Sequence, residues 1–194
     1  MSKRTITAGF TLIELLVTIS IAAVLMALAV PSFTTWQRNS ELTSIANSLM
    51  ASINAARSEA IKKGRYAMVV PTDAANWNNG WTVFVDVDRS QTLTGGTVDN
   101  IVVTTPASPA YVTMTGNGSA SGLTPYIMFD ASGYARLKGT AGFGASTLEI
   151  QRNDVSSTEQ LRQTRRVKIA STGQVRICTP TSATDANCQA AAGL

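Results

Sequence analysis

The hydrophobic and polar positions divide the chain into three consecutive parts. Residues 10–30 are predominantly apolar, with a single charge, Glu14, and neither proline nor glycine. As a helix, this stretch is long enough to cross ~30 Å of hydrocarbon. Between Leu42 and Ala60, apolar residues recur every three or four positions, which is typical of an amphipathic helix. From Arg65 onward the period falls to two, which indicates β-strands.

The first two parts together predict one long helix from about Thr11 to Lys63. We expect Pro31 to bend this helix and Gly64 to end it. Its second part, residues 31–64, should pack on the rest of the chain. The apolar positions of that part are Leu42, Ile45, Leu49, Ile53, Ala56 and Ala60. A coiled-coil stalk is the alternative, but so short a repeat with small residues favours packing on a sheet.

The third part predicts a series of short strands. They are Tyr66–Val70, Trp81–Val87, Asn100–Thr104, Ala110–Met114, Tyr126–Phe129, Tyr134–Leu137, Thr147–Arg152, Arg165–Ala170 and Gln174–Cys178. Turn signals lie between them, including residues 78–80 (Asn-Asn-Gly) and 116–118 (Gly-Asn-Gly). Such alternation indicates an antiparallel sandwich or a related double-sheet domain.

The predicted fold class is therefore α+β. A long N-terminal transmembrane and amphipathic helix should pack on one antiparallel, β-sandwich-like globular domain of residues 65–194. About 130 residues is an ordinary size for a single hydrophobic core. We find no second domain and no internal repeat in the sequence.

Composition restricts the chemistry that this domain can carry out. The chain has 16 Lys and Arg against 12 Asp and Glu, and no histidine. The lack of histidine excludes His-based catalytic triads, histidine general bases and nearly all zinc sites. Serine, threonine and aspartate are frequent, but no pattern indicates an activated nucleophile. We expect neither enzymatic activity nor a cofactor.

The start of the apolar stretch carries the most specific motif. Residues 9–14 read Gly-Phe-Thr-Leu-Ile-Glu and follow Lys3 and Arg4. This resembles the class III leader of the type IV pilin superfamily, in which a prepilin peptidase cuts after the glycine and N-methylates the new first residue. The resemblance implies a leader of residues 1–9, cleavage between Gly9 and Phe10, and assembly with other pilins into a filament.

The same resemblance gives Glu14 a role and the chain a location. A carboxylate in an apolar span costs roughly 2.5–3.5 kcal/mol at the bilayer centre, so a partner for the charge is implied. In the superfamily that partner is thought to be the terminal amine of a neighbouring subunit, which suits a low-dielectric site. Residues 10–30 would cross the inner membrane once, with the basic N-terminus cytoplasmic and the globular domain periplasmic.

Two simpler explanations of the N-terminus fit the sequence less well. Ala27-Leu28-Ala29 matches the cleavage site of an ordinary secretory signal peptide. However, an acidic residue at the front of the apolar core is unusual for a signal peptide, and the helical pattern continues past that site. A single-span anchor without an assembly role is the other alternative, and it gives Glu14 no purpose.

Further along, the sequence resembles the GspH/FimT family of minor pilins and pseudopilins. The resemblance rests on residues 57–60 (Arg-Ser-Glu-Ala), 77–86, 129–133 and 167–178. It implies either a FimT-like minor pilin of a type IV pilus or a GspH-like pseudopilin of the type II secretion system. The insertion at residues 88–125 matches nothing in this pattern.

Cys178 and Cys188 are the only cysteines. Outside the membrane disulfides persist, so we expect these residues to form a bridge that orders the tail. Family members often have a cysteine just after the first strand, where this chain has Pro71-Thr72, and this difference also favours the local bridge. Two free thiols are the alternative.

The C-terminal quarter is basic, and its strand register can be predicted. Positive charges outnumber negative ones between residues 152 and 176. A three-residue loop of residues 171–173, with Gly173 in the left-handed conformation, would place Ile169 opposite Val175 and Lys168 opposite Arg176. Lys168 and Arg176 would then share the exposed face of the hairpin.

Some FimT-type proteins use a Gly-Arg-x-Arg motif near the C-terminus to bind DNA, and residues 173–176 (Gly-Gln-Val-Arg) resemble it. The resemblance implies that Arg166, Lys168, Gln174 and Arg176 bind double-stranded DNA without sequence preference. Affinity should be weaker than in the relatives, because Gln174 replaces an arginine and releases no counterion. A solvated basic face without a ligand is the alternative.

Residues 86–90 (Asp-Val-Asp-Arg-Ser) resemble the start of a calcium loop. They lack the glycine at the sixth position and the acidic residue at the twelfth. We therefore favour a solvated turn and expect no metal site. Trp77 and Trp81 are most simply explained by core and turn packing.

Overall fold

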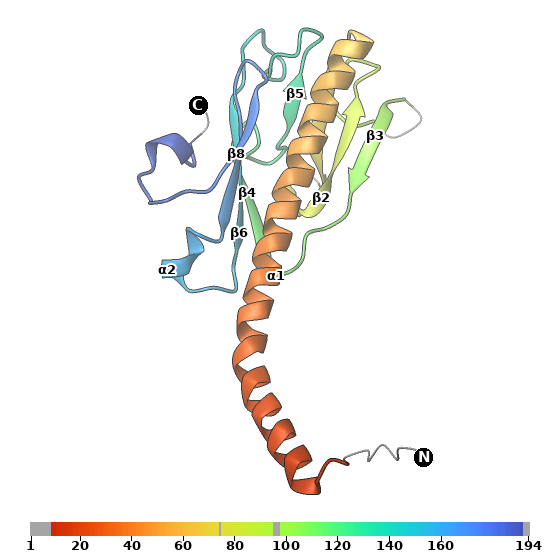
Figure 1. The fold of residues 1–194 in the computed structure, drawn as a ribbon. Coiled ribbons are helices and arrows are strands. Elements are labelled where there is room, and N and C mark those ends of the chain that lie inside the picture. The colour runs from red at the N-terminus through yellow and green to blue at the C-terminus, as the bar shows by residue number, and fades with distance from the viewer. Residues whose placement is uncertain (1–8, 74, 95–97, 192–194) are drawn as a thin grey trace, which may run out of the picture. The chain divides into compact units, whose positions relative to one another are not determined.

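The computed structural model describes residues 9–73, 75–94 and 98–191 (Figure 1). These residues form two compact units with a boundary between Ser40 and Glu41, and each unit is described by itself. Helix α1 (Leu12–Lys63) runs through both units. Its bounds confirm the predicted helix to within one residue.

The ends of α1 have the local geometry that the sequence predicts. Gly64 has a φ of 63°, and the following residue, Arg65, donates its amide to the carbonyl of Ala60 (3.2 Å). A left-handed glycine directly after the last helical residue is a common helix end, because it has no Cβ to oppose that conformation.

By length and hydropathy, no single straight helix among the described residues is sufficient to cross a membrane. Two helical segments separated by a bend, Leu12–Ala27 and Ser32–Lys63, meet the criterion together. The bend falls at the predicted position next to Pro31.

In the unit of residues 41–194, one face of α1 is completely buried. Its fully buried positions are Leu42, Ala46, Leu49, Ile53, Ala56 and Ala60. Only Ile45 departs from the predicted face, because it is partly buried while Ala46 occupies the core. The three- and four-residue spacing thus predicts the packed face well.

Two antiparallel sheets complete this unit. The first has the order β3-β2-β1-β5 and the second β4-β6-β7-β8. The strands of the first are β1 (Ala67–Asp73), β2 (Asn76–Val85), β3 (Asn100–Thr105) and β5 (Ile127–Phe129). Those of the second are β4 (Val112–Gly118), β6 (Ser146–Arg152), β7 (Thr164–Ile169) and β8 (Val175–Cys178). Two short helical segments, α2 (Ser157–Gln160) and η1 (Ala186–Cys188), lie in the second half of the chain.

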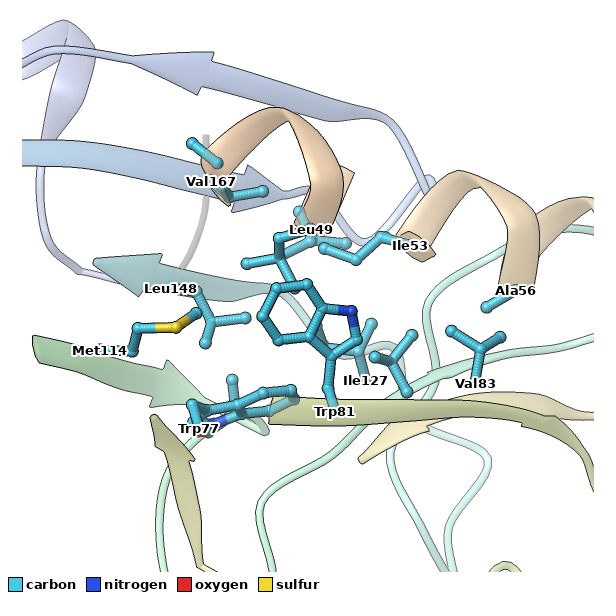
Figure 2. Close-up of a cluster of buried hydrophobic side chains, with 14 of the residues drawn as sticks. Leu49, Ile53, Ala56, Trp77, Trp81, Val83, Met114, Ile127, Leu148 and Val167 are labelled. Atoms are coloured by element: carbon cyan, nitrogen blue, oxygen red, sulfur yellow. The ribbon is translucent and has the colours of Figure 1, made fainter. Parts of the chain in front are cut away.

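The core lies where α1 contacts both sheets (Figure 2). Leu49 of α1, Trp81 of β2 and Leu148 of β6 belong to one buried cluster. Trp77 is buried as well, and its indole N–H donates to the carbonyl of Ala120 (2.9 Å). These contacts confirm the predicted α+β fold and the core role of both tryptophans.

The predicted turn at residues 78–80 is wrong, because these residues lie inside β2. Asn78 is polar because it links the two sheets: its side-chain oxygen accepts from the amide of Met114 (2.6 Å). Gly80 is required by close packing, since a Cβ there would lie 2.2 Å from the carbonyl oxygen of Thr105. Asn78 and Gly80 thus look like a turn signal in the sequence, but both are needed for contacts with strands that are distant in sequence.

A second predicted turn, at residues 116–118, and one predicted strand, Tyr134–Leu137, also differ from the structure. Residues 116–118 belong to β4 and pair with β6, with Gly116 opposite Leu148. The predicted strand Tyr134–Leu137 is reduced to two isolated bridges, between Phe129 and Ala135 and between Arg136 and Phe143. The glycines at 116 and 118 resemble a turn signal although they lie within a paired strand.

Candidate functional site

The Glu14 carboxylate lies at the N-terminal end of α1. Its Oε2 accepts hydrogen bonds from the amide (2.9 Å) and the hydroxyl (2.8 Å) of Thr11. The Thr11 hydroxyl in turn accepts from the amide of Glu14 (3.3 Å). This is a Thr-x-x-Glu capping box, which satisfies amides that have no partner within the helix. Glu14 therefore has a local structural role in addition to the predicted role in assembly.

The predicted cleavage site lies just before this helix. Phe10 is 86% exposed, and a Cβ built on Gly9 would have no neighbour within 4 Å. Nothing in the described part of this unit covers the bond between Gly9 and Phe10. The leader before Gly9 lies outside the described residues.

The unit of residues 1–40 exposes apolar side chains on all sides of α1. The exposed large hydrophobic residues include Leu12, Ile13, Leu15, Leu16, Val17, Ile19, Ile21, Val24, Leu25, Met26, Val30, Phe33 and Trp36. A helix that is apolar all round requires apolar surroundings, from lipid or from other helices. This surface suits the predicted membrane segment of residues 10–30.

The β7–β8 hairpin has the predicted register. Ile169 pairs with Val175, and Lys168 pairs with Arg176. Gly173 has a φ of 82°, and its amide donates to the carbonyl of Ala170 (2.9 Å). The three-residue loop is therefore confirmed.

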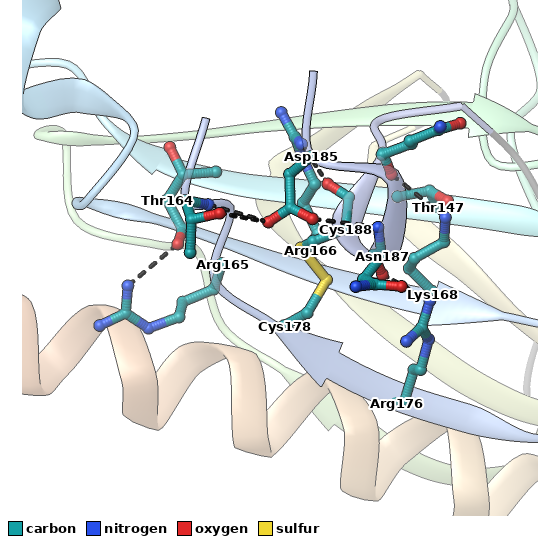
Figure 3. The surroundings of a disulfide bond; sticks show 12 residues. Thr147, Thr164, Arg165, Arg166, Lys168, Arg176, Cys178, Asp185, Asn187 and Cys188 are labelled. Atoms are coloured by element: carbon teal, nitrogen blue, oxygen red, sulfur yellow. Dashed lines mark hydrogen bonds between the residues drawn. A yellow bond between two sulfur atoms is a disulfide. The ribbon is translucent and has the colours of Figure 1, made fainter. Parts of the chain in front are cut away.

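The prediction that the basic face of this hairpin is exposed is wrong. Residues 179–191, here called the tail, cover it (Figure 3). Arg166 donates to the carbonyl of Cys188, and the Lys168 ammonium donates to the carbonyls of Gln189 (3.2 Å) and Ala191 (3.4 Å). Lys168 is only 2% exposed. Main-chain oxygens of the tail thus occupy the positions expected for phosphate.

The remaining residues of the predicted DNA site are arranged differently. Arg176 is half-buried and donates to the carbonyl of Asn187 (2.7 Å). Gln174 is exposed. Arg166 also pairs with Glu149 of β6, a partner that no pattern in the sequence indicates. The structure brings Arg166, Lys168 and Arg176 together beneath the tail, with Arg176 half-buried and Gln174 exposed to solvent.

The burial of Lys168 has an electrostatic consequence. Desolvation lowers the pKa of its ammonium, and the charges of Arg176 and Arg166 lower it further. Three cations on one face repel one another, and the carbonyl oxygens of the tail partly compensate them.

The predicted disulfide between Cys178 and Cys188 is present. Asp185 holds the turn between the two cysteines: its carboxylate accepts from the amide (3.0 Å) and hydroxyl (2.9 Å) of Thr181 and from the amide of Asn187 (3.0 Å). These hydrogen bonds lower the pKa of Asp185. The bridge fixes a tail that contributes little apolar surface of its own.

The wider basic run does not form one open patch. Arg152 is buried and makes two hydrogen bonds of 2.8 Å to Asp154. The Arg165 guanidinium donates to the carbonyls of Arg162 and Thr164. Several of the basic residues counted in the sequence are thus held by local contacts.

Of the residues that resemble a calcium loop, 87–90 are exposed and follow the buried strand β2, as predicted for a solvated turn. Asp88 is exposed, but Asp86 is completely buried, and Asp99 joins them from the start of β3. Asp99 was missed because it is distant in sequence.

Comparison with known proteins agrees with these features. The family model described as type II transport protein GspH matches residues 46–173, and the prokaryotic N-terminal methylation motif matches residues 5–30. None of the curated proteins compared with the chain matches it significantly.

Two solved structures of the type IV minor pilin FimU from Pseudomonas aeruginosa are similar to this chain. The first, in space group P21, is 20% identical with a TM-score of 0.53, and covers 74% of this chain and 95% of that chain. The second, in space group P65, is 18% identical with a TM-score of 0.49, and covers 72% and 98%. The first similarity shows that the fold is that of a type IV pilin. Since the GspH model matches more than half of the residues, the chain belongs to the GspH family, and it is a minor pilin or pseudopilin of a type IV pilus or a type II secretion system.

Proposed function

We propose that this protein is a FimT-like minor pilin that is incorporated into, or primes, a type IV pilus. The N-terminal unit supports assembly into a filament, because a methylation motif precedes a helix that is apolar on all sides. The observation that favours a pilus is the similarity of the fold to the type IV minor pilin FimU. Cleavage between Gly9 and Phe10 would leave this helix as a single inner-membrane span until assembly. The globular domain would lie in the periplasm, where a disulfide is stable.

A pseudopilin of the type II secretion system is the second candidate. The family description favours it, whereas the similar solved structures are those of a type IV minor pilin. Both roles share the leader and the helix, so the N-terminus does not discriminate between them. In either system we propose a structural role, in which the apolar N-terminal half of α1 drives assembly with other subunits.

Deletion of the gene with separate assays of piliation and protein secretion tests this choice. We expect the deletion strain to have fewer surface pili and normal secretion, and we expect the protein in the sheared pilus fraction of the wild-type strain. Normal piliation together with a secretion defect would support the pseudopilin role instead. The intact mass of membrane-extracted protein should correspond to a chain that begins with methylated Phe10.

For DNA binding by the β7–β8 hairpin, our proposal is restricted to one state of the tail. The cations Arg166, Lys168 and Arg176 support it by their proximity, but the tail covers them. We therefore propose that duplex DNA binds this face only after the tail leaves the sheet.

Titration with short DNA duplexes at ~50 mM salt tests this proposal. The oxidised protein is compared with a Cys178→Ser/Cys188→Ser variant. The hypothesis predicts binding by the variant alone, falling steeply with salt because phosphate contacts dominate. Adding Lys168→Ala to the variant should flatten the salt dependence by about one unit. Equal behaviour of all three proteins would rule out this face as a DNA site.

A further inference from the structure

The connection between β2 and β3 brings three carboxylates together. Asp86 directly follows β2, and Asp99 directly precedes β3, in which Asn100 pairs with Val85. Ligand atoms of Asp86, Asp88 and Asp99 all lie within 4.8 Å of one another. Strand pairing therefore fixes two of the three carboxylates at one place.

The burial of this cluster is unusual for carboxylates. Asp86 is fully buried, and Asp99 is 2% exposed, while Asp88 faces solvent. Buried ionised groups require compensation by hydrogen bonds, an opposite charge or a metal ion. Lys138 provides one positive charge near Asp86, against the three carboxylates of the cluster. The cluster is thus closed on the protein side and open at Asp88.

The hydrogen bonds of the loop leave one buried oxygen without a donor. Asp86 Oδ2 accepts from the amide of Gln91 (3.1 Å), but Asp86 Oδ1 is buried and has no hydrogen-bond partner. Asp99 Oδ1, in contrast, accepts from the amide of Val87 (3.0 Å). A buried acceptor without a donor is costly, so Asp86 Oδ1 indicates that the cluster takes a further group.

A second carboxylate oxygen of the cluster, next to Thr94, also lacks a donor. The hydroxyl of Thr94 lies 3.0 Å from Asp88 Oδ2 and 2.7 Å from Asp99 Oδ2, yet a hydroxyl has only one proton to donate. The amide of Thr94 also donates to Asp99 Oδ2 (2.8 Å), so Asp88 Oδ2 is the oxygen left short. Asp86 and Asp88 each therefore have an oxygen available for a cation.

We propose that Asp86, Asp88 and Asp99 form a calcium-binding site. The available ligands are carboxylate oxygens, which suit a hard cation, whereas zinc, copper and nickel favour sites with nitrogen or sulfur ligands. Ca²⁺ accepts irregular geometry and completes its shell with water, which can enter on the exposed side of Asp88. Mg²⁺ demands stricter octahedral geometry.

Calcium at this site would neutralise the cluster and tie the start of β3 to the end of β2. A dissociation constant of roughly 10⁻⁴ to 10⁻³ M is expected, as in calcium sites of extracellular modules. This inference is independent of the choice between pilus and secretion system.

Calorimetric titration of the chelator-treated, detergent-solubilised protein with CaCl₂ tests the site. We expect about one ion per chain, at least tenfold weaker binding of MgCl₂, and a melting temperature raised by several degrees in millimolar calcium. Asp88→Asn should weaken calcium binding at least tenfold with little effect on folding, because Asp88 is exposed. Asp73→Asn, an exposed carboxylate outside the cluster, is the matched control and should bind as the wild type does.

Asp86→Asn keeps the shape of the buried side chain and is a second test of the site. It shows whether a loss of calcium binding occurs in a protein that remains folded. It should fold, since it removes charge repulsion, and it should lose the calcium-dependent rise in melting temperature. The proposal is overturned if the wild type gives no binding at ~10 mM calcium, well above the expected dissociation constant, or if the Asp88 and Asp86 variants bind like the wild type. Equal affinity for magnesium would overturn the assignment to calcium.

Discussion

At the scale of single residues, Glu14 combines a local and an intermolecular role. Its carboxylate accepts two hydrogen bonds from Thr11 in the isolated chain. A glutamine can accept the same hydrogen bonds, because a capping box takes either residue. The negative charge is therefore not needed for the cap, and substitution can separate the two roles.

We expect Glu14→Gln to abolish filament incorporation as fully as Glu14→Ala, because both remove the charge that would meet the terminal amine of a neighbour. Thr11→Ala should retain incorporation, since losing an N-cap costs only about 1 kcal/mol. Immunoblots of sheared filaments, with cleavage checked by mass, measure this. Wild-type incorporation of the glutamine variant would show that Glu14 acts only as a cap.

Glu149 illustrates a second kind of residue, one that compensates a buried charge. The side chains of Arg166 and Glu149 are 9% and 19% exposed. Removing one member of a buried ion pair leaves an uncompensated charge in a region of low dielectric.

We expect Glu149→Gln to lower the free energy of unfolding by roughly 2–4 kcal/mol in urea titrations. Glu59→Gln is the control: its partner Lys62 is 70% exposed, and surface pairs contribute about 0–1 kcal/mol. Similar effects of the two substitutions would contradict the importance assigned to burial.

At the scale of elements, the tail is held by one covalent bond and by hydrogen bonds to cations. Breaking the Cys178–Cys188 bridge should cost about 2–3 kcal/mol for so short a loop, on the chain-entropy account of disulfide stabilisation. Without the bridge, the carbonyls of residues 187–191 have little apolar contact to keep them on the sheet.

We therefore expect reduction, or the Cys178→Ser/Cys188→Ser variant, to expose Lys168. Amine labelling followed by mass spectrometry should find Lys168 protected in the oxidised protein and modified in the variant. The exposed Lys62 serves as the internal control and should react equally in both. Continued protection of Lys168 in the variant would mean that the hydrogen bonds alone hold the tail.

The elements also show how far the sequence determines the fold. The register of the β7–β8 hairpin was predictable because Val167 and Ile169 alternate with cations, and because Gly173 permits a left-handed loop. Glycine is required at position 173 for a second reason, which the sequence does not reveal: a Cβ there would lie 2.0 Å from the carbonyl oxygen of Gly133. The glycine that begins the segment resembling a DNA-binding motif is therefore also explained by packing.

The two features that the sequence did not predict, the covering of Lys168 and the position of Asp99, share a physical cause. Coverage of Lys168 by the tail depends on main-chain carbonyls, which every residue has, so no side-chain pattern announces it. Asp99 joins Asp86 through strand pairing across a connection that has no pattern of its own. Local periodicity predicts elements and faces, but it does not predict which distant segment contacts a polar face.

At the scale of the whole molecule, α1 supplies apolar surface for two different purposes. Leu49 is fully buried in the domain core, whereas Leu25 is 61% exposed in the N-terminal unit. Among the described side chains of the helix, the buried hydrophobic positions begin at Leu42, within the unit of residues 41–194. The same residue type should thus serve stability in one half and assembly in the other.

We expect Leu49→Ala to lower the free energy of unfolding by roughly 2–5 kcal/mol, as is usual for a leucine removed from a packed core. Leu25→Ala should leave this free energy unchanged, because Leu25 contacts no core, yet it should reduce recovery of the protein in sheared filaments. Urea unfolding followed by the fluorescence of the buried Trp77 and Trp81 measures the first effect, and immunoblots measure the second. If Leu25→Ala destabilised the domain as much as Leu49→Ala, the two halves of the helix could not have separate roles.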